Sequence, residues 1–126
     1  MNAPFEVTGI DHVVFHVKDL ARSRKFYTEV LGFECVAEQI DEDGGWAKLT
    51  RDDAAIMLSS PNQHEEDKAP AFTGSLYMNT DDVDAIWETV KDKARICYRI
   101  EDFEYGMREF GIYDNNGYLL QFGQEI

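Results

Sequence analysis

The chain of 126 residues contains little cysteine and no long hydrophobic run. Its two cysteines, Cys35 and Cys97, are too few for a disulfide framework and lack metal-binding spacing. Both lie in segments expected to be strands, so we expect buried, reduced thiols and a cytoplasmic location. No apolar run approaches the roughly 20 residues that a membrane-spanning helix needs. Residues 1–8 also lack the charged and apolar regions of a secretory signal.

Positive charge is scarce as well, because 12 Lys and Arg face 25 Asp and Glu and give a formal net charge of −13. Nucleic acids and anionic membranes bind Lys and Arg, so this balance argues against both as partners. It would attract a cationic small molecule, although the same charge is typical of an ordinary acidic cytosolic protein.

The sequence also lacks a phosphate loop, a nucleophile elbow and a dinucleotide-binding fingerprint. Its adjacent glycine pair, Gly44–Gly45, lies in an expected hairpin turn. Hydrolase and nucleotide-binding functions are therefore set aside.

A hydrophobic content of 44% predicts one domain with a core, built from two similar series of elements. The first series predicts a strand at 9–17, a helix at 20–31 capped by Asp19 and stopped by Gly32, and strands at 33–40, 46–50 and 54–59. A polar linker at 60–71, which contains His64, follows. The second series predicts a strand at 75–79, a helix that begins after Asp81 or Asp82 and ends near residue 94, a strand at 96–100, a loop at 101–106 and a closing hairpin around 114–117.

The two series match at one constant offset, with Asp19 corresponding to Asp82 and His12 to Ser75. This match indicates an internal duplication, with module one at 8–60 and module two at 72–126. Each module has one helix and four strands, and neither can cover both faces of its sheet alone. We therefore expect an α+β fold in which two βαβββ modules pack their sheets edge to edge into a cup, with the helices outside.

The order of these segments resembles the vicinal oxygen chelate superfamily. That group contains glyoxalase I, extradiol dioxygenases, methylmalonyl-CoA epimerase, and the fosfomycin and bleomycin resistance proteins. The resemblance covers nearly the whole chain and rests on segments 10–14, 19–33, 82–84 and 114–122. It implies paired βαβββ modules, a cup-shaped cavity and usually a homodimer.

Enzymes of that superfamily hold a divalent metal at four strand positions, which fall here on His12, Met57, Ser75 and Gln121. His12 is a strong ligand and Gln121 an occasional one, whereas the Ser75 hydroxyl is weak and the Met57 thioether too soft for an oxygen-rich site. A catalytic metal normally takes three protein ligands and an open position. We therefore expect no cofactor and a bond between His12 and a neighbour such as Gln121. The alternative is a divalent metal held by His12 and Gln121.

Alternation along the strands directs apolar, aromatic and polar side chains toward the expected cavity, as is usual for small-molecule sites. Glu109 is the carboxylate among them, and it either acts as a general base or pairs with Arg108 or Lys48. Gln121 must bond a neighbour or face a ligand, since an unpaired buried amide costs about 1–3 kcal/mol. The expected ligand-binding residues are His12, Val14, His16, Trp46, Met57, Ser75, Tyr77, Tyr105, Glu109 and Gln121.

Two functions follow from these residues. The first is a metal-free protein that binds or sequesters a small, cationic ligand, similar to the bleomycin resistance branch. The alternative is a lyase, isomerase or dioxygenase in which a metal on His12 and Gln121, aided by His16 or Glu109, acts on a substrate with vicinal oxygens. In a metal-free version of that enzyme, Glu109 is the general base.

Overall fold

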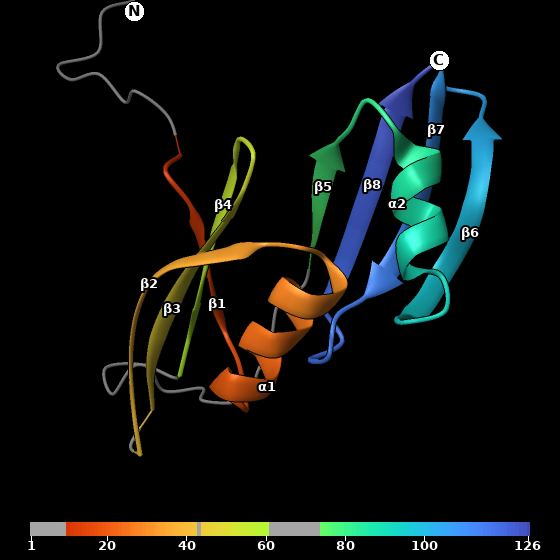
Figure 1. Cartoon of the computed structure of the whole chain (residues 1–126). Coiled ribbons are helices and arrows are strands. Elements are labelled where there is room, and N and C mark those ends of the chain that lie inside the picture. Colours follow the sequence, from red (N-terminus) through yellow and green to blue (C-terminus); the bar gives the residue numbers. More distant parts are fainter. Residues whose placement is uncertain (1–9, 43, 61–73) are drawn as a thin grey trace, which may run out of the picture.

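Two four-stranded sheets, each with its own helix, make up the computed structural model, which describes residues 10–42, 44–60 and 74–126 (Figure 1). Sheet A has the strand order β1-β4-β3-β2, from β1 (Val13–His16), β4 (Ala54–Ser59), β3 (Gly44–Arg51) and β2 (Glu34–Asp41). Sheet B repeats this order with β5 (Ser75–Asn79), β8 (Leu119–Glu125), β7 (Met107–Tyr113) and β6 (Arg95–Phe103). In each sheet the strand that comes first along the chain pairs in parallel with the strand that comes last. The other neighbouring strands pair antiparallel. The predicted α+β class and the two βαβββ modules are confirmed.

Both helices begin at the caps that the sequence predicts. The Asp19 carboxylate accepts the Arg22 N–H at 3.0 Å before α1 (Leu20–Lys25), and the Asp82 carboxylate accepts the Ala85 N–H at 3.1 Å before α2 (Val83–Val90). After α1 the chain continues as a π-helical segment, η1 (Phe26–Val30), which the sequence did not predict. The segment ends before Gly32, whose φ of +72° explains the glycine there.

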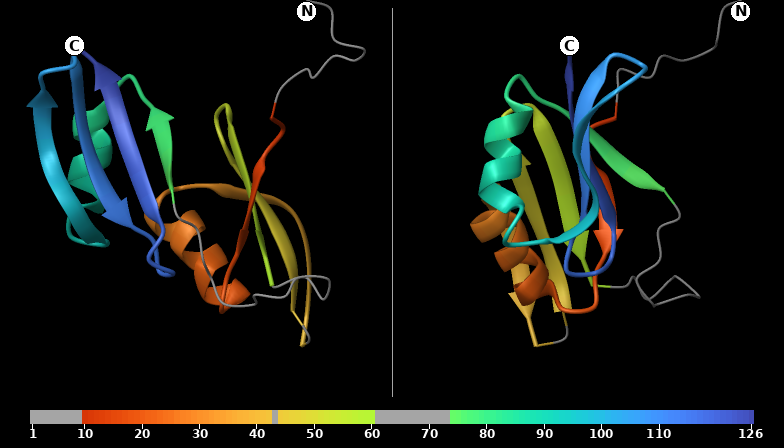
Figure 2. Two further views of the ribbon diagram at one scale, coloured as in Figure 1. Left: turned by 180° about the vertical axis from the view of Figure 1, so that it is seen from behind. Right: turned by 90° about the vertical axis from the view of Figure 1, so that its right-hand side faces the viewer.

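The core lies between each helix and one face of its own sheet, and no helix or strand of the described part of the chain covers the opposite faces (Figure 2). Phe15 of β1 and Leu58 of β4 are buried in module one, as Phe110 of β7 is in module two. The Trp87 ring of α2 packs 5.1 Å from the Phe110 ring and is 6% exposed, which confirms its predicted place in the core. We call the uncovered surfaces the open face of sheet A and the open face of sheet B.

The β7–β8 turn joins the two modules. The Tyr27 hydroxyl of η1 donates to the buried Asp114 carboxylate at 2.7 Å. The Tyr118 ring stacks 4.8 Å from the Phe15 ring, and its hydroxyl donates to the His16 carbonyl. The turn itself was predicted from its Asp, Asn and Gly residues, but its contacts with the other module were not.

Several local predictions are wrong. β6 continues to Phe103 through part of the expected loop, and Gly44–Gly45 belong to β3. Cys97 is exposed and Cys35 half-buried, so the thiols are not both buried. Cys97 lies on an edge strand, beside a shift in the pairing register between Ile96 and Tyr98. The linker and His64 lie outside the described residues.

Across the described ranges, none of the helices combines the length and the hydrophobicity that crossing a membrane requires.

Candidate ligand site on the open face of sheet B

Three tyrosines surround Glu109 on the open face of sheet B. The Glu109 Oε1 accepts hydrogen bonds from the Tyr77 hydroxyl at 3.0 Å and the Tyr105 hydroxyl at 2.6 Å, and Oε2 accepts one from the Tyr98 hydroxyl. Tyr77 lies on β5, Tyr98 on β6, Tyr105 in the β6–β7 turn and Glu109 on β7. Glu109 is only 3% exposed. We call these four residues the tyrosine–carboxylate cluster.

Two glycines let the phenol rings lie across the sheet. Gly111 is the cross-strand partner of Tyr98, and a Cβ placed on it would lie 2.5 Å from the Tyr98 ring. A Cβ on Gly123 would overlap the Tyr77 hydroxyl in the same way. Any larger residue at either position would push a phenol away from Glu109.

A chain of hydrogen bonds extends the cluster toward the first residue of β5. The Ser75 hydroxyl donates to Gln121 Oε1 at 2.6 Å, and Gln121 Nε2 donates to the Tyr98 oxygen at 3.0 Å. The network thus brings together five residues that the sequence predicted for ligand binding: Ser75, Tyr77, Tyr105, Glu109 and Gln121.

Tyr98 was missed by the sequence analysis. It lies in a segment that was predicted as a strand, but its direction depends on pairing with Gly111. A tyrosine opposite a glycine on the neighbouring strand is the signal that would have found it, and that signal requires the register.

The cluster carries one negative charge near neutral pH. Burial raises the pKa of Glu109, but the hydrogen bonds from Tyr105, Tyr98 and Tyr77 outweigh it and lower the pKa below its usual value. The bond to Glu109 raises the pKa of Tyr105 to about 12. Burial, and then the same carboxylate, raises the pKa of Tyr98 and Tyr77. An ionised carboxylate stabilised in this way is a weak general base.

The ion pairs considered for Glu109 do not form. Arg108 instead contacts Asp84 and Asp102, each at 2.9 Å, and Lys48 contacts Asp11 at 3.4 Å. In the described part of the chain, every hydrogen bond to the Glu109 carboxylate therefore comes from a neutral phenol.

The other predicted ligand-binding residues belong to sheet A. His12, just before β1, bonds Asp11 through Nδ1 at 2.6 Å rather than Gln121. On its open face, Val14 is 47% exposed and pairs in register with Met57. His16 and Trp46 each pair in register with Ser59 of β4 and are half-buried. No hydrogen bond within residues 10–42, 44–60 and 74–126 joins these side chains to the tyrosine–carboxylate cluster.

The four positions that correspond to the superfamily's metal ligands fit a catalytic metal poorly. They supply one imidazole, one thioether, one hydroxyl and one amide, and both polar atoms of the Gln121 amide already bond Ser75 and Tyr98. Within the described ranges, no three His, Cys, Asp or Glu side chains group as a metal-binding set.

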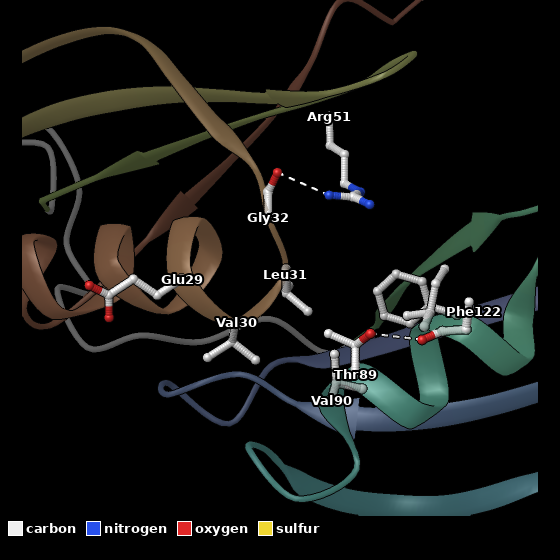
Figure 3. Close-up of a pocket in the computed structure, with 10 residues that line it drawn as sticks. Glu29, Val30, Leu31, Gly32, Arg51, Thr89, Val90 and Phe122 are labelled. Atoms are coloured by element: carbon white, nitrogen blue, oxygen red, sulfur yellow. Dashed lines mark hydrogen bonds between the residues drawn. The ribbon is translucent and has the colours of Figure 1, made fainter.

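Two cavities lie between the modules along α2. One, of about 250 Å³, is bordered by the end of η1, where the Arg51 guanidinium donates to the Gly32 carbonyl at 3.1 Å (Figure 3). The other, of about 820 Å³, lies between the β3–β4 turn and the start of α2, and carboxylates such as Asp52 and Asp82 line it. These two have local roles, Asp52 in a turn with φ of +51° and Asp82 as a helix cap. Of the predicted ligand-binding residues, Tyr77 alone lines one of these cavities. The tyrosine–carboxylate cluster, which contains more of those residues, is therefore a stronger candidate for the ligand site than either cavity.

The chain belongs to the Glyoxalase/Bleomycin resistance protein/Dioxygenase superfamily, whose sequence profile matches residues 9–122. This membership confirms the resemblance that the segment order indicated. No curated protein matches the sequence.

Three solved structures illustrate the shared fold. TnmS3, an antibiotic binding protein from Streptomyces sp. CB03234, has a TM-score of 0.79 and 21% identity over 97% of this chain and 99% of its own. TioX from Micromonospora sp. ML1 has a TM-score of 0.76 and 21% identity over 94% of this chain and 100% of its own. The fosfomycin resistance protein FosX from Listeria monocytogenes has a TM-score of 0.73 and 15% identity over 96% of each chain. Identities this low establish the shared fold alone.

Proposed function

We propose that this protein binds a small organic cation at the tyrosine–carboxylate cluster and does so without a metal. The observation that carries the proposal is the buried Glu109 carboxylate, which is bonded by three phenols on an open sheet face. The shared fold with TnmS3, whose description names it an antibiotic binding protein, is consistent with a binding role.

The cluster has the chemistry that recognises a positive charge. The faces of aromatic rings attract cations, by about 0.5–1 kcal/mol at exposed sites and about 2 kcal/mol when desolvated. The Phe103 ring stacks 5.4 Å from the Tyr105 ring and meets the edge of the Tyr98 ring at 5.8 Å, which extends the aromatic surface. The formal charge of −13 adds long-range attraction for a cation.

The lyase, isomerase or dioxygenase alternative has less support. It needs at least two free ligands, and both polar atoms of the Gln121 amide already bond Ser75 and Tyr98. The Asp11 bond at Nδ1 leaves Nε2 of His12 as a single imidazole ligand, which is fewer than a catalytic metal takes. The metal-free version needs Glu109 as a base, and the phenols lower the pKa of that carboxylate. We therefore place binding ahead of catalysis.

A second copy of the chain is the proposed partner, and a cytoplasmic location the proposed setting. Val14 on sheet A is 47% exposed, and Tyr77 and Tyr105 on sheet B are 43% and 62% exposed, so both open faces present apolar surface. We expect a homodimer that covers part of these faces. Light scattering during size-exclusion chromatography tests this, and a monomer at all concentrations would contradict it.

Calorimetric titration in buffer that contains EDTA tests the proposed function. The probes are choline and 3,3-dimethyl-1-butanol, its neutral isostere, in which carbon replaces the ammonium nitrogen. We expect choline to bind and the isostere to bind at least tenfold more weakly. Glu109→Gln should remove this preference, whereas Glu42→Gln, which removes the same charge from an exposed turn of module one, should retain it. Equal binding of the two probes to the unaltered protein, or no binding of choline, would overturn the proposal.

A further inference from the structure

The charge on Glu109 fixes the direction of every hydrogen bond in the chain that leads to Ser75. An ionised carboxylate has lone pairs and no proton, so the Tyr98 hydroxyl must donate to it. The Tyr98 oxygen can then only accept from Gln121, which places the amide nitrogen toward Tyr98 at 3.0 Å.

The same reasoning continues from Gln121 to Ser75. With its nitrogen toward Tyr98, the Gln121 amide turns its oxygen toward Ser75, and an amide oxygen only accepts. Ser75 must therefore donate its single proton inward, over 2.6 Å. The oxygen of Ser75, an exposed residue, keeps lone pairs alone for any other partner.

Both ends of the chain are consequently acceptors. A carboxylate has about four lone-pair sites and no proton, and Glu109 accepts from three phenols. Ser75, at the other end, has no proton left to give. A ligand carbonyl or ether oxygen beside Ser75 would place its lone pairs against those of the Ser75 oxygen. A ligand hydroxyl or N–H would instead donate a hydrogen bond to that oxygen.

We infer that the ligand is an organic cation with a second hydrogen-bond donor several atoms from its charge, as in an amino alcohol or a diamine. The cationic group occupies the tyrosine–carboxylate cluster, and the second donor bonds the Ser75 oxygen at the start of β5. This inference rests on the proposed function and names Ser75 and Gln121 as the residues that determine specificity.

Three probes that share one cationic group test the inference by calorimetric titration. They are hexyltrimethylammonium, its ω-hydroxyl derivative and the methyl ether of that derivative, which accepts but cannot donate. We expect the hydroxyl derivative to bind the unaltered protein about fivefold more tightly than the ether, which is the effect of one net hydrogen bond.

The variants at Ser75 separate a specific bond from general polarity. Ser75→Ala should abolish the preference for the hydroxyl over the ether, because the oxygen that accepts the ligand hydroxyl is then gone. Ser75→Thr retains the hydroxyl and should retain the preference. If all three probes bind the unaltered protein equally, or if Ser75→Ala retains the preference, the inference fails and the proposed function stands. If none of the cations binds, the proposed function fails and the inference with it.

Discussion

At the scale of single residues, the arrangement around Glu109 stabilises an anion away from water without a basic partner. Three neutral phenols supply the hydrogen bonds that water would otherwise provide, so the negative charge remains available to a ligand. This differs from an ion pair, in which Arg or Lys would cancel the attraction for a cation.

The contribution of Glu109 to stability should depend on pH. Because the pKa of Glu109 is lowered in the folded chain, its stabilising effect is complete above the unfolded glutamate pKa of about 4.3 and is lost as the pH falls through the folded value. We expect Glu109→Gln to lower the free energy of unfolding by about 1.5–3 kcal/mol at neutral pH, as for hydrogen bonds to a charged group. Urea titrations should show this difference shrinking toward zero in acid, and a difference that grows in acid would contradict the assignment.

Gly111 should be intolerant of a side chain for a steric reason. Its φ is not in the left-handed region, so Gly111→Ala tests only the clash with the Tyr98 ring, 2.5 Å from the added Cβ. We expect a loss of about 1–3 kcal/mol of stability from overpacking, together with weaker binding of choline. A double-mutant cycle with Tyr98→Ala provides the control, since the alanine should cost much less once the ring is gone. Equal costs in both backgrounds would show that the ring does not lie over Gly111.

At the scale of elements, the β7–β8 turn makes side-chain contacts that hold the two modules together. The Tyr27 hydroxyl bonds the Asp114 carboxylate, which is 6% exposed and also accepts the backbone N–H groups of Asn116 and Tyr118. The turn therefore positions β8, and with it Gln121, relative to module one.

Removing the Tyr27 hydroxyl should weaken this contact between the modules. We expect Tyr27→Phe to lower the free energy of unfolding by about 1–3 kcal/mol, because the buried Asp114 loses a donor that water cannot replace. Tyr113→Phe removes a hydroxyl from a half-buried ring at the end of β7 and should cost well under half as much in urea titrations. If the two variants lower the free energy of unfolding equally, the Tyr27–Asp114 bond does not hold the modules together.

Most elements could be predicted from the sequence because they depend on local chemistry. Asp19 and Asp82 cap helices, Gly32 ends one, and alternating Val and Phe residues mark the buried face of β1. Alternation along the expected strands predicted four residues of the candidate site, and Tyr105 was expected at the rim of the cavity. Tyr98, the exposed Cys97 and the length of β6 could not be predicted, because they depend on which residues face one another across strands.

At the scale of the whole molecule, the excess of acidic residues should govern how fast a cation arrives and have little effect on how fast it leaves. Added salt shortens the screening length from about 10 Å at 0.1 M to about 3 Å at 1 M. Across this range we expect the association rate of a cationic probe to fall several-fold, with the dissociation rate nearly constant, since the final contacts are with the buried Glu109. Stopped-flow fluorescence measures both rates, and a salt effect confined to dissociation would contradict this view.

The most direct test of cation capture by the tyrosine rings is the proton NMR spectrum of choline with the protein. Ring currents move the methyl resonance upfield when the ammonium lies over aromatic faces. We predict an upfield shift that saturates with the unaltered protein, persists in EDTA, and disappears with Glu109→Gln. A methyl resonance that does not move, or that moves equally with Glu109→Gln, would contradict the account.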